Sequence, residues 1–416
     1  MKLKECLVKY FLRYVNIPSQ STSNAPMVPS TEGQRKLAAV LAEDLKALGA
    51  VDIEISDTSV VTAHIPARLS AGHVPVPTVG WVAHLDTVDV KLSEVIHPKM
   101  IRNYDGNDIV QNAEKNLTIS VQEHPELKKY IGDDIIVSDG TSVLGADNKA
   151  AIANIMTVLE LLHEDETIEH GTIYVAFVPD EEVGLRGSKS MDFTRFPVDF
   201  AYTIDCCEKG ELVYETFNAG SAVLSIKGQT AHPMSSKNNV VNPALIAVDF
   251  VNLLDRAETP EHTENTEGFI WVTGISADVL NAKVTMSIRD HSKQKYEAKK
   301  AYLEKAVEMV RMKHPKAEIS LQTEDVYANI ADAVTDKNRK CIDYLFEGMK
   351  QLDITPKVMA MRGGTDGSFI STKGILVPNY FTGAHNFHAS CEFLPLSGFE
   401  ASCRLTLKLI ELITKG

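Results

Sequence analysis

Residues 148–164 read NKAAIANIMTVLELLHE, and residues 172–178 read TIYVAFV. The first stretch repeats its apolar residues at helical spacing, and the second is an apolar, β-branched run typical of a buried strand. VGWVAHL at 79–85 and FAYTID at 200–205 have the same strand character. Strands that alternate with helices along a chain usually form a parallel sheet whose faces are covered by the helices. The sequence therefore predicts an α/β fold with a mixed, mostly parallel sheet.

A second kind of pattern interrupts this alternation near residue 212. Five strand-like and two helical segments follow there: ELVYETF, SAVLSIKG, FIWVTGI, AKVTMSIRD and AEISLQT, with helices at 243–255 and 293–313. After residue 327 a helix, a strand and a final helix resume the first pattern. We therefore predict an α/β domain formed by residues 1–211 and 327–416, with an α+β lid or dimerisation domain inserted at 212–326. Residues 91–134 are polar and weakly periodic, which predicts an elaborated loop.

The composition excludes some classes of function. The 416 residues include 42 Lys and Arg against 56 Asp and Glu, a net charge of −14, whereas a nucleic-acid-binding protein needs a basic surface. No apolar run approaches the roughly 20 residues of a membrane span. Six cysteines are too few for a disulfide scaffold in a chain of this length. We therefore expect a cytoplasmic enzyme that binds neither nucleic acid nor membrane.

Histidine and carboxylate residues stand where the expected strands end. They occur in HLD at 84–86, GADNK at 145–149, PDEEVG at 179–184, Asp205 and GAHNFH at 383–388. Parallel sheets place their ligand sites at this edge. Imidazole and carboxylate bind zinc-type divalent metals, and a bridging carboxylate allows two metals about 3.5–4 Å apart. Paired glutamates alone usually lie on the solvated surface, so it is the joint placement that indicates a metal-dependent hydrolase.

Four of these motifs together carry a family resemblance. HLDT at 84–87, GADNK at 145–149, PDEEVG at 179–184 and RGGTDG at 362–367 resemble the peptidase T group of the M20 metallopeptidases, which are tripeptide aminopeptidases. The resemblance extends over essentially the whole chain and includes VPSTEG at 28–33, AHP at 231–233 and IRD at 288–290. It implies a zinc-peptidase-like catalytic domain with an inserted lid domain.

The resemblance implies a role for each candidate metal ligand. Two zinc ions would be held by His84 and Asp205, by Glu182 and His388, and by Asp147 as the bridge between them. We choose His388 over His385 because the family pattern aligns on asparagine, an aromatic residue and histidine. The family also holds the bond after the bridging aspartate in the cis form, here Asp147–Asn148.

Two carboxylates beside the ligands complete the implied catalytic residues. Glu181 would be the general base, which accepts the proton of the attacking water. Asp86 would orient His84, because a metal-bound imidazole usually donates its other N–H to a carboxylate or a carbonyl.

The resemblance also implies three residues that bind substrate. His232 would steady the oxyanion, Arg289 would bind the C-terminal carboxylate of the peptide, and Arg362 matches another substrate-contacting position. The alternative for the two arginines is a structural ion pair with one of the many acidic residues.

The chain departs from the family pattern next to two of the ligands. Cys206 and Cys207 stand after Asp205, where the family has glycines, and residues 389–392 replace a glycine and a basic stretch after His388. The adjacent thiols are explained either by inert packing or by an oxidation-sensitive role.

We therefore predict a di-zinc aminopeptidase that removes the N-terminal residue from short peptides with a free N-terminus, tripeptides above all. A hydroxide activated by the metals would attack the carbonyl, with Glu181 as the base. Co²⁺ or Mn²⁺ could replace Zn²⁺, because ligand type alone does not select among these metals. Lid domains of this superfamily often pair, which suggests a homodimer.

Three alternatives stay open from the sequence. Within the superfamily, the chain could be a deacylase or desuccinylase that acts on N-acyl amino acids, or a dipeptidase. More distantly, it could be a non-catalytic relative that uses the fold for binding. A dinucleotide-binding oxidoreductase shares the β/α alternation, but no G-x-G-x-x-G follows the early strands.

Overall fold

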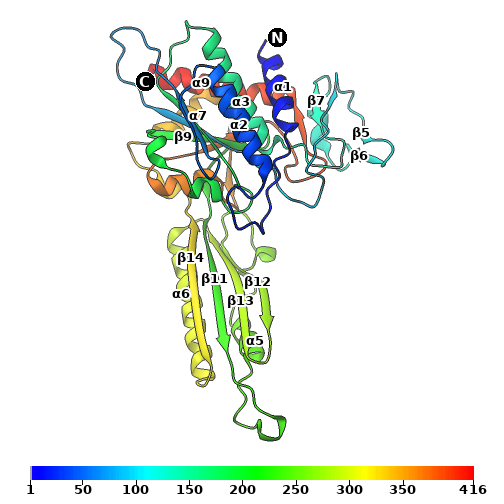
Figure 1. The fold of residues 1–416 in the computed structure, drawn as a ribbon, viewed down its shortest axis with the longest axis vertical. Helices are drawn as coiled ribbons and strands as arrows, with labels where there is room; N and C mark the ends of the chain where they lie inside the picture. The colour runs from blue at the N-terminus through cyan, green and yellow to red at the C-terminus, as the bar shows by residue number, and fades with distance from the viewer. Residues whose placement is uncertain (1) are drawn as a thin grey trace. The chain divides into compact units, whose positions relative to one another are not determined.

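The structure is a computed structural model that describes residues 2–416. The chain forms two compact units (Figure 1). Unit 1 contains the residues up to Tyr214 together with Val334–Met359 and Thr365–Gly416, and unit 2 contains Glu215–Ala333 and Ala360–Gly364. Among the helices of residues 2–416, none has the length and apolar character that crossing a membrane requires.

Unit 1 is built on an eight-stranded sheet with the order β1-β2-β8-β3-β9-β16-β10-β15. Its strands are β1 (Val51–Ile55), β2 (Val61–Ile65), β3 (Val79–His84), β8 (Ile173–Val178), β9 (Phe200–Cys206), β10 (Glu211–Thr216), β15 (Lys357–Met361) and β16 (Asn379–Phe381). The four central strands β8, β3, β9 and β16 run parallel, whereas β2 and β10 are antiparallel to their neighbours β8 and β16. The predicted mixed sheet is confirmed.

Helices pack against both faces of this sheet, as the sequence predicts for an α/β fold. They are α1 (Lys2–Val15), α2 (Glu32–Ala47), α3 (Ala146–Glu164), α4 (Arg186–Lys189), α7 (Lys340–Gln351), α8 (Asp366–Ile370) and α9 (Leu396–Lys415). Strand β3 is buried along its whole length. Val82 packs with Phe196 and Ile370 on one face, while Trp81 meets Ile155 of α3 on the other. This two-sided burial explains the nearly continuous apolar sequence of the strand.

A small substructure of unit 1 lies outside the central sheet. It contains β4 (Lys99–Ile101), β7 (Ile135–Val137) and β17 (Phe393–Pro395) in one sheet, the hairpin β5 (Ile109–Asn112) and β6 (Leu117–Ile119), and the 3₁₀ helix η1 (Pro125–Tyr130). The sequence predicts only an elaborated loop at 91–134, because strands of three or four residues are too short to show a period. These elements share an apolar core that includes Tyr104, Tyr130 and Phe393.

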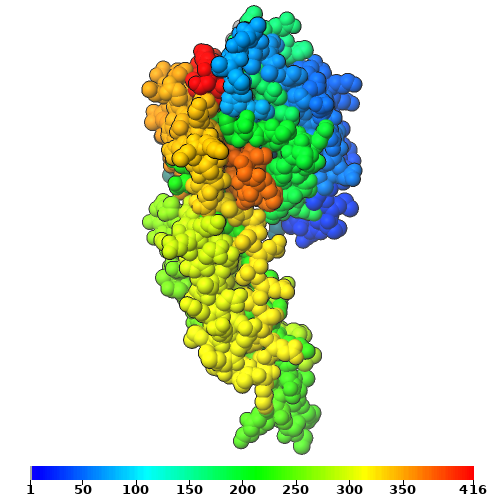
Figure 2. Space-filling view, turned by 90° about the vertical axis from the view of Figure 1, so that its left-hand side faces the viewer, coloured from blue at the N-terminus to red at the C-terminus, as the bar shows by residue number. Residues whose placement is uncertain are grey.

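Unit 2 is an α+β sandwich of one sheet and two helices. Its antiparallel strands follow the order β12-β13-β11-β14: β12 (Phe269–Ala277), β13 (Asn281–Asp290), β11 (Asn218–Lys227) and β14 (Glu318–Tyr327). Helices α5 (Pro243–Val251) and α6 (Lys293–Lys313) cover one face, where Phe250 and Val307 pack with Leu224 and Val284. The yellow surface of unit 2 in Figure 2 includes α6, which Figure 1 labels next to β14.

Both units also contain short 3₁₀ helices, at Phe193–Arg195, Pro233–Ser235, Pro260–His262, Ile330–Ala333 and Ser371–Lys373.

One predicted strand pairs differently from our expectation. The segment ELVYETF was counted with the inserted domain, but β10 pairs with β16 in the central sheet, where Leu212 faces Tyr380 and Val213 faces Asn379. An alternating sequence indicates a strand without naming its partner, and β10 leads directly into β11, so the sequence pattern could not separate them.

Candidate metal centre

The parallel strands bring the candidate residues to one edge of the sheet. His84 ends β3, the Glu181-Glu182 pair follows β8, and Asp205 is the penultimate residue of β9. Because β3 is parallel to both β8 and β9, their carboxyl ends lie side by side. Asp147 enters this edge from the start of α3, and His388 enters from the loop between β16 and β17.

Asp147 lies between two imidazoles. Its Oδ1 atom is 2.9 Å from Nε2 of His84, and its Oδ2 atom is 3.0 Å from Nε2 of His388. Asp205 Oδ1 is 3.8 Å from the same nitrogen of His84, and Glu182 Oε1 is 2.9 Å from that of His388. The carboxylate of Asp147 therefore belongs to two clusters, one on each of its oxygens.

Each cluster offers the donor set of a divalent metal. In His84, Asp147 and Asp205, and again in Asp147, Glu182 and His388, the candidate ligand atoms lie within 4.8 Å of one another. Glu181 lies within the same reach of His84 and Glu182. One nitrogen and two carboxylate oxygens form a typical zinc donor set, and the shared aspartate is suited to bridging two ions.

The electrostatics of the edge also fit cations. Burial and the nearby charge of Asp147 raise the pKa of Glu182 and of Asp205 above the ordinary range, and burial raises the pKa of Glu181. Hydrogen bonds to Asp147 and Glu182 raise the pKa of the His388 imidazole. These shifts share one cause, because buried carboxylates at such close range favour any added positive charge. A metal ion can supply that charge in place of protons.

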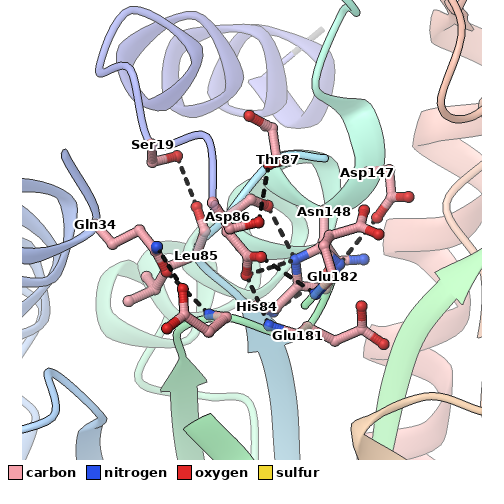
Figure 3. Close-up of polar contacts among 12 residues, drawn as sticks. Ser19, Gln34, His84, Leu85, Asp86, Thr87, Asp147, Asn148, Glu181 and Glu182 are labelled. Carbon is pink, nitrogen blue, oxygen red and sulfur yellow. Dashed lines mark hydrogen bonds and ion pairs between the residues drawn. The ribbon is translucent and has the colours of Figure 1, made fainter. Parts of the chain in front are cut away.

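Asp86 supports three of the candidate residues at once (Figure 3). Its backbone carbonyl is 2.9 Å from Nδ1 of His84, while its carboxylate is 3.4 Å from that nitrogen. The same carboxylate accepts the backbone N–H groups of Glu181 at 3.0 Å and Glu182 at 3.2 Å. Asp86 is fully buried, so its side chain fixes the loop after β8 as well as lying beside the histidine ring.

Asn148 links two of the strand ends through its amide. The side-chain nitrogen donates to Oδ1 of Asp205 at 2.9 Å and to the carbonyl of Ile204 at 2.8 Å, and the side-chain oxygen accepts the backbone N–H of His84. The Asp147–Asn148 peptide bond is cis, as the resemblance implies.

Sequence reasoning missed the role of Asp180, which is buried directly before Glu181. Its carboxylate accepts the backbone N–H of Ser30 at 2.8 Å, the Ser30 hydroxyl at 2.6 Å and the Gln34 amide at 2.8 Å. Asp180 also has a left-handed backbone with φ of 56°. The network holds the chain from which Glu181 projects. Ser30 lies in the motif VPSTEG and Asp180 lies in PDEEVG. The presence of both motifs was the one sequence feature that could have indicated this network.

Sequence reasoning also missed Glu392, which is 1% exposed. Its carboxylate accepts three backbone N–H groups, from Leu144 at 2.7 Å, Gly145 at 2.8 Å and Asp147 at 3.1 Å. Glu392 therefore fixes the turn that presents the bridging candidate Asp147. No sequence pattern pointed to it, because the partners are backbone groups about 250 residues away.

The two histidines of the loop after β16 have different surroundings. His388 faces Asp147 and Glu182, whereas His385 is buried and its Nε2 lies 2.6 Å from the hydroxyl of Tyr130. Burial lowers the pKa of His385 to about 4. His385 takes part in none of the candidate metal clusters within residues 2–416.

The cysteines next to the ligands also lie outside the candidate clusters of residues 2–416. All six cysteines are free thiols. Burial raises the pKa of Cys206 and of Cys207, and it raises that of Cys391 as well. A thiol with a raised pKa forms little of the reactive thiolate, which favours inert packing over an oxidation-sensitive role.

The three expected substrate-binding residues lie in unit 2. His232 is exposed, and its Nδ1 accepts the backbone N–H of Met234 at 3.3 Å. Arg289 in β13 donates to the carbonyls of Gly220 at 3.0 Å and Ile288 at 2.9 Å.

Arg362 is held more tightly within unit 2. Its guanidinium donates to the carbonyls of Asn265 and Glu267 and to the Thr263 hydroxyl, and it lies over the rings of Phe217 and Phe269. Neither Arg289 nor Arg362 forms an ion pair with a carboxylate in the described part of the chain, contrary to the structural alternative considered for them.

Known proteins resemble the chain over nearly its full length. Residues 145–412 match the family model of peptidase family M20/M25/M40. A peptidase T-like protein of Yersinia pestis is 51% identical over 404 residues, 97% of this chain and 97% of that protein. Peptidase T of Caldanaerobacter subterraneus is 41% identical over 98% of this chain and 99% of its own. The crystal structure of aminopeptidase PepT from Bacillus cereus has the same fold, with a TM-score of 0.75 at 22% identity over 99% of this chain and 98% of that one.

The buried His385 predicts a pH dependence of stability. The unfolded chain protonates this histidine below about pH 6.5, but the folded chain does so only near pH 4, so its contribution is complete above 6.5 and falls as the pH drops toward 4. Between pH 7.5 and 5.0 we expect a loss of roughly 1–2 kcal/mol from this residue alone. Urea unfolding of the wild type and of His385→Phe at both pH values measures it. Every other group titrates in both proteins, so equal losses in the two would contradict the prediction.

Proposed function

The chain belongs to peptidase family M20/M25/M40 and to its peptidase T group, and on that premise we propose that it is a metallo-aminopeptidase acting on short peptides. Its preferred substrates are tripeptides with a free N-terminus. Relatives named peptidase T, at 39–41% identity over almost the whole chain, support this substrate class.

We propose that the enzyme holds two zinc ions. His84 and Asp205 bind one ion, Glu182 and His388 bind the other, and Asp147 bridges them. The observation that carries this proposal is the placement of the two Asp147 oxygens, each about 3 Å from a different histidine. Zinc suits the nitrogen and oxygen donors, although Co²⁺ and Mn²⁺ bind the same set.

The proposed chemistry divides between the cations and the side chains. When bound, the cations polarise the peptide carbonyl and lower the pKa of the attacking water. Glu181 accepts the proton of that water and delivers it to the leaving amine. Asp86 supports this role by binding the backbone of Glu181 and Glu182, so that the base and the ligand project from one fixed loop.

For substrate binding we propose the residues of unit 2 that the resemblance indicates. Arg289 binds the C-terminal carboxylate of the peptide and His232 steadies the oxyanion, with Arg362 as a further contact. The support for Arg289 is that its guanidinium contacts backbone carbonyls and the Tyr327 ring but forms no ion pair with a carboxylate in residues 2–416. The hydrogen bonds and aromatic rings around Arg362 favour a supporting role for that residue.

We further propose a cytoplasmic location and a homodimer. The free state of all six cysteines supports a reducing compartment. Exposed apolar side chains on unit 2 support pairing through β12 and α5: Trp271 and Ile275 on the strand, and Leu245 and Val248 on the helix.

Glu181→Gln tests the general base. The amide cannot accept the proton, so we expect kcat to fall by about 10²–10⁴-fold, while bound zinc stays at the wild-type level because the ligands are intact. Turnover of a tripeptide and elemental analysis on the same preparation measure both quantities. Glu43→Gln on the exposed face of α2 is the matched control and should behave as the wild type. Wild-type turnover by Glu181→Gln would contradict the assignment.

A substrate panel tests the specificity. We expect hydrolysis of an unblocked tripeptide, at least tenfold slower hydrolysis of its N-acetylated form, and no hydrolysis of either after a chelator removes the metal. Preference for N-acyl amino acids would identify a deacylase, and preference for dipeptides would identify a dipeptidase. Failure to hydrolyse any of these with zinc added would favour a non-catalytic binding protein.

A further inference from the structure

The loop that carries His388 is closed by a narrow neck. His385 and Phe393 form an antiparallel bridge in which the N–H of His385 donates to the carbonyl of Phe393 at 2.9 Å and the reverse bond spans 3.2 Å. The residues between them, 386–392, form the loop itself. Both His388 and Glu392 project from this loop toward Asp147.

The loop fixes Asp147 at two different points. His388 faces its carboxylate, and Glu392 accepts its backbone N–H together with those of Leu144 and Gly145. A shift of the neck would therefore move both a candidate metal ligand and the support of the bridging carboxylate.

Packing around the ring does not fix His388. Its side chain is 47% exposed, and its backbone is left-handed with φ of 63°. Asn386 is also left-handed, with φ of 59°. Asparagine tolerates this conformation, whereas a bulkier residue such as histidine holds it where the surroundings impose it. Besides its contacts with Asp147 and Glu182, the position of the His388 ring therefore depends on how firmly its backbone is held at the neck.

Tyr130 of η1 contacts the neck directly. Its hydroxyl lies 2.6 Å from Nε2 of His385, whose ring also stacks on Phe393 with centroids 4.7 Å apart. The phenol and the imidazole therefore share one hydrogen bond, in which the tautomer of His385 decides which group is the donor. Tyr130 itself is buried in the apolar core of the small substructure around β4 to β7.

Three further contacts join the same substructure to the loop. Gln111 of β5 donates its amide to the carbonyl of Ser390 at 2.8 Å. The amide of Asn386 lies 3.2 Å from Nδ1 of His124 and 3.3 Å from Glu126. After the loop, β17 pairs with β7, so the substructure holds the loop at its neck, along its length and at its exit.

We propose that Tyr130 and His385 are positioning residues, which hold the loop so that His388 and Glu392 meet Asp147. The part of the substructure formed by residues 99–137 thus acts as a support for the metal centre. This inference rests on the proposed function, because it assigns the support of a site that must bind two cations. Residues behind metal ligands commonly change metal affinity by 10–100-fold when they are replaced.

Tyr130→Phe, compared with Tyr104→Phe, tests the proposal. Tyr104 is buried in the same apolar core, and its hydroxyl also forms one hydrogen bond of 2.6 Å, but the partner is the carbonyl of Asn107. Both variants lose one hydroxyl from one core, so their melting temperatures should fall by similar amounts. Only Tyr130→Phe should weaken the binding of the zinc ion that we assign to Glu182 and His388, by about tenfold or more. The same variant should lower kcat with little change in KM.

The measurements use the full chain. Zinc affinity is determined by competition with a chromophoric chelator, and kcat and KM are determined on an unblocked tripeptide. Equal zinc affinity and equal kcat in the two variants would overturn the proposal, whatever the wild-type activity.

The controls separate this inference from the proposed function. If the wild type binds two zinc ions but hydrolyses no peptide, the proposed function fails, while the zinc comparison still decides the inference. If the wild type binds no zinc, both fail. Should Tyr130→Phe not fold, Gln111→Leu replaces it, because that change removes the amide that holds Ser390. Unchanged zinc affinity in Gln111→Leu would then overturn the proposal.

Discussion

The placement of the Asp147 carboxylate between two imidazoles is the constraint on which the rest of the site depends. Each oxygen faces a different histidine, at 2.9 Å and 3.0 Å, with a further carboxylate beside each ring. Buried carboxylates repel one another unless positive charge lies between them. Such a cluster is costly without cations and well matched to two of them. The surrounding structure therefore has to hold like charges close together.

Hydrogen bonds from backbone N–H groups do much to hold these like charges close together. Asp86 binds the backbone of Glu181 and Glu182, Asp180 binds Ser30, and Glu392 binds the turn before Asp147. Each is a buried carboxylate that accepts two or more N–H groups, which are the strong, charge-assisted kind of hydrogen bond. The acidic excess of the chain is thus concentrated partly in groups that shape the site without facing substrate.

The sequence predicts the parts of this site that follow from periodicity and strand ends. Strands β3, β8 and β9 are readable as apolar runs, and the polar residue after a buried strand marks the edge where ligands gather. Asp180 and Glu392 were not predictable in this way, because their partners lie 150 and 248 residues away in the chain. The sequence also failed to predict the partner of β10 and the existence of the three-residue strands, for a related reason. Such features are decided by tertiary contacts, which leave no local pattern.

Anomalous diffraction tests most directly whether Asp147 bridges two cations. Crystals of the full chain grown with zinc would be measured on both sides of the zinc absorption edge. We predict two anomalous peaks about 3.5–4 Å apart, one beside His84 and Asp205 and the other beside Glu182 and His388, with the Asp147 carboxylate between them. A single peak, or peaks that do not contact Asp147, would contradict the account.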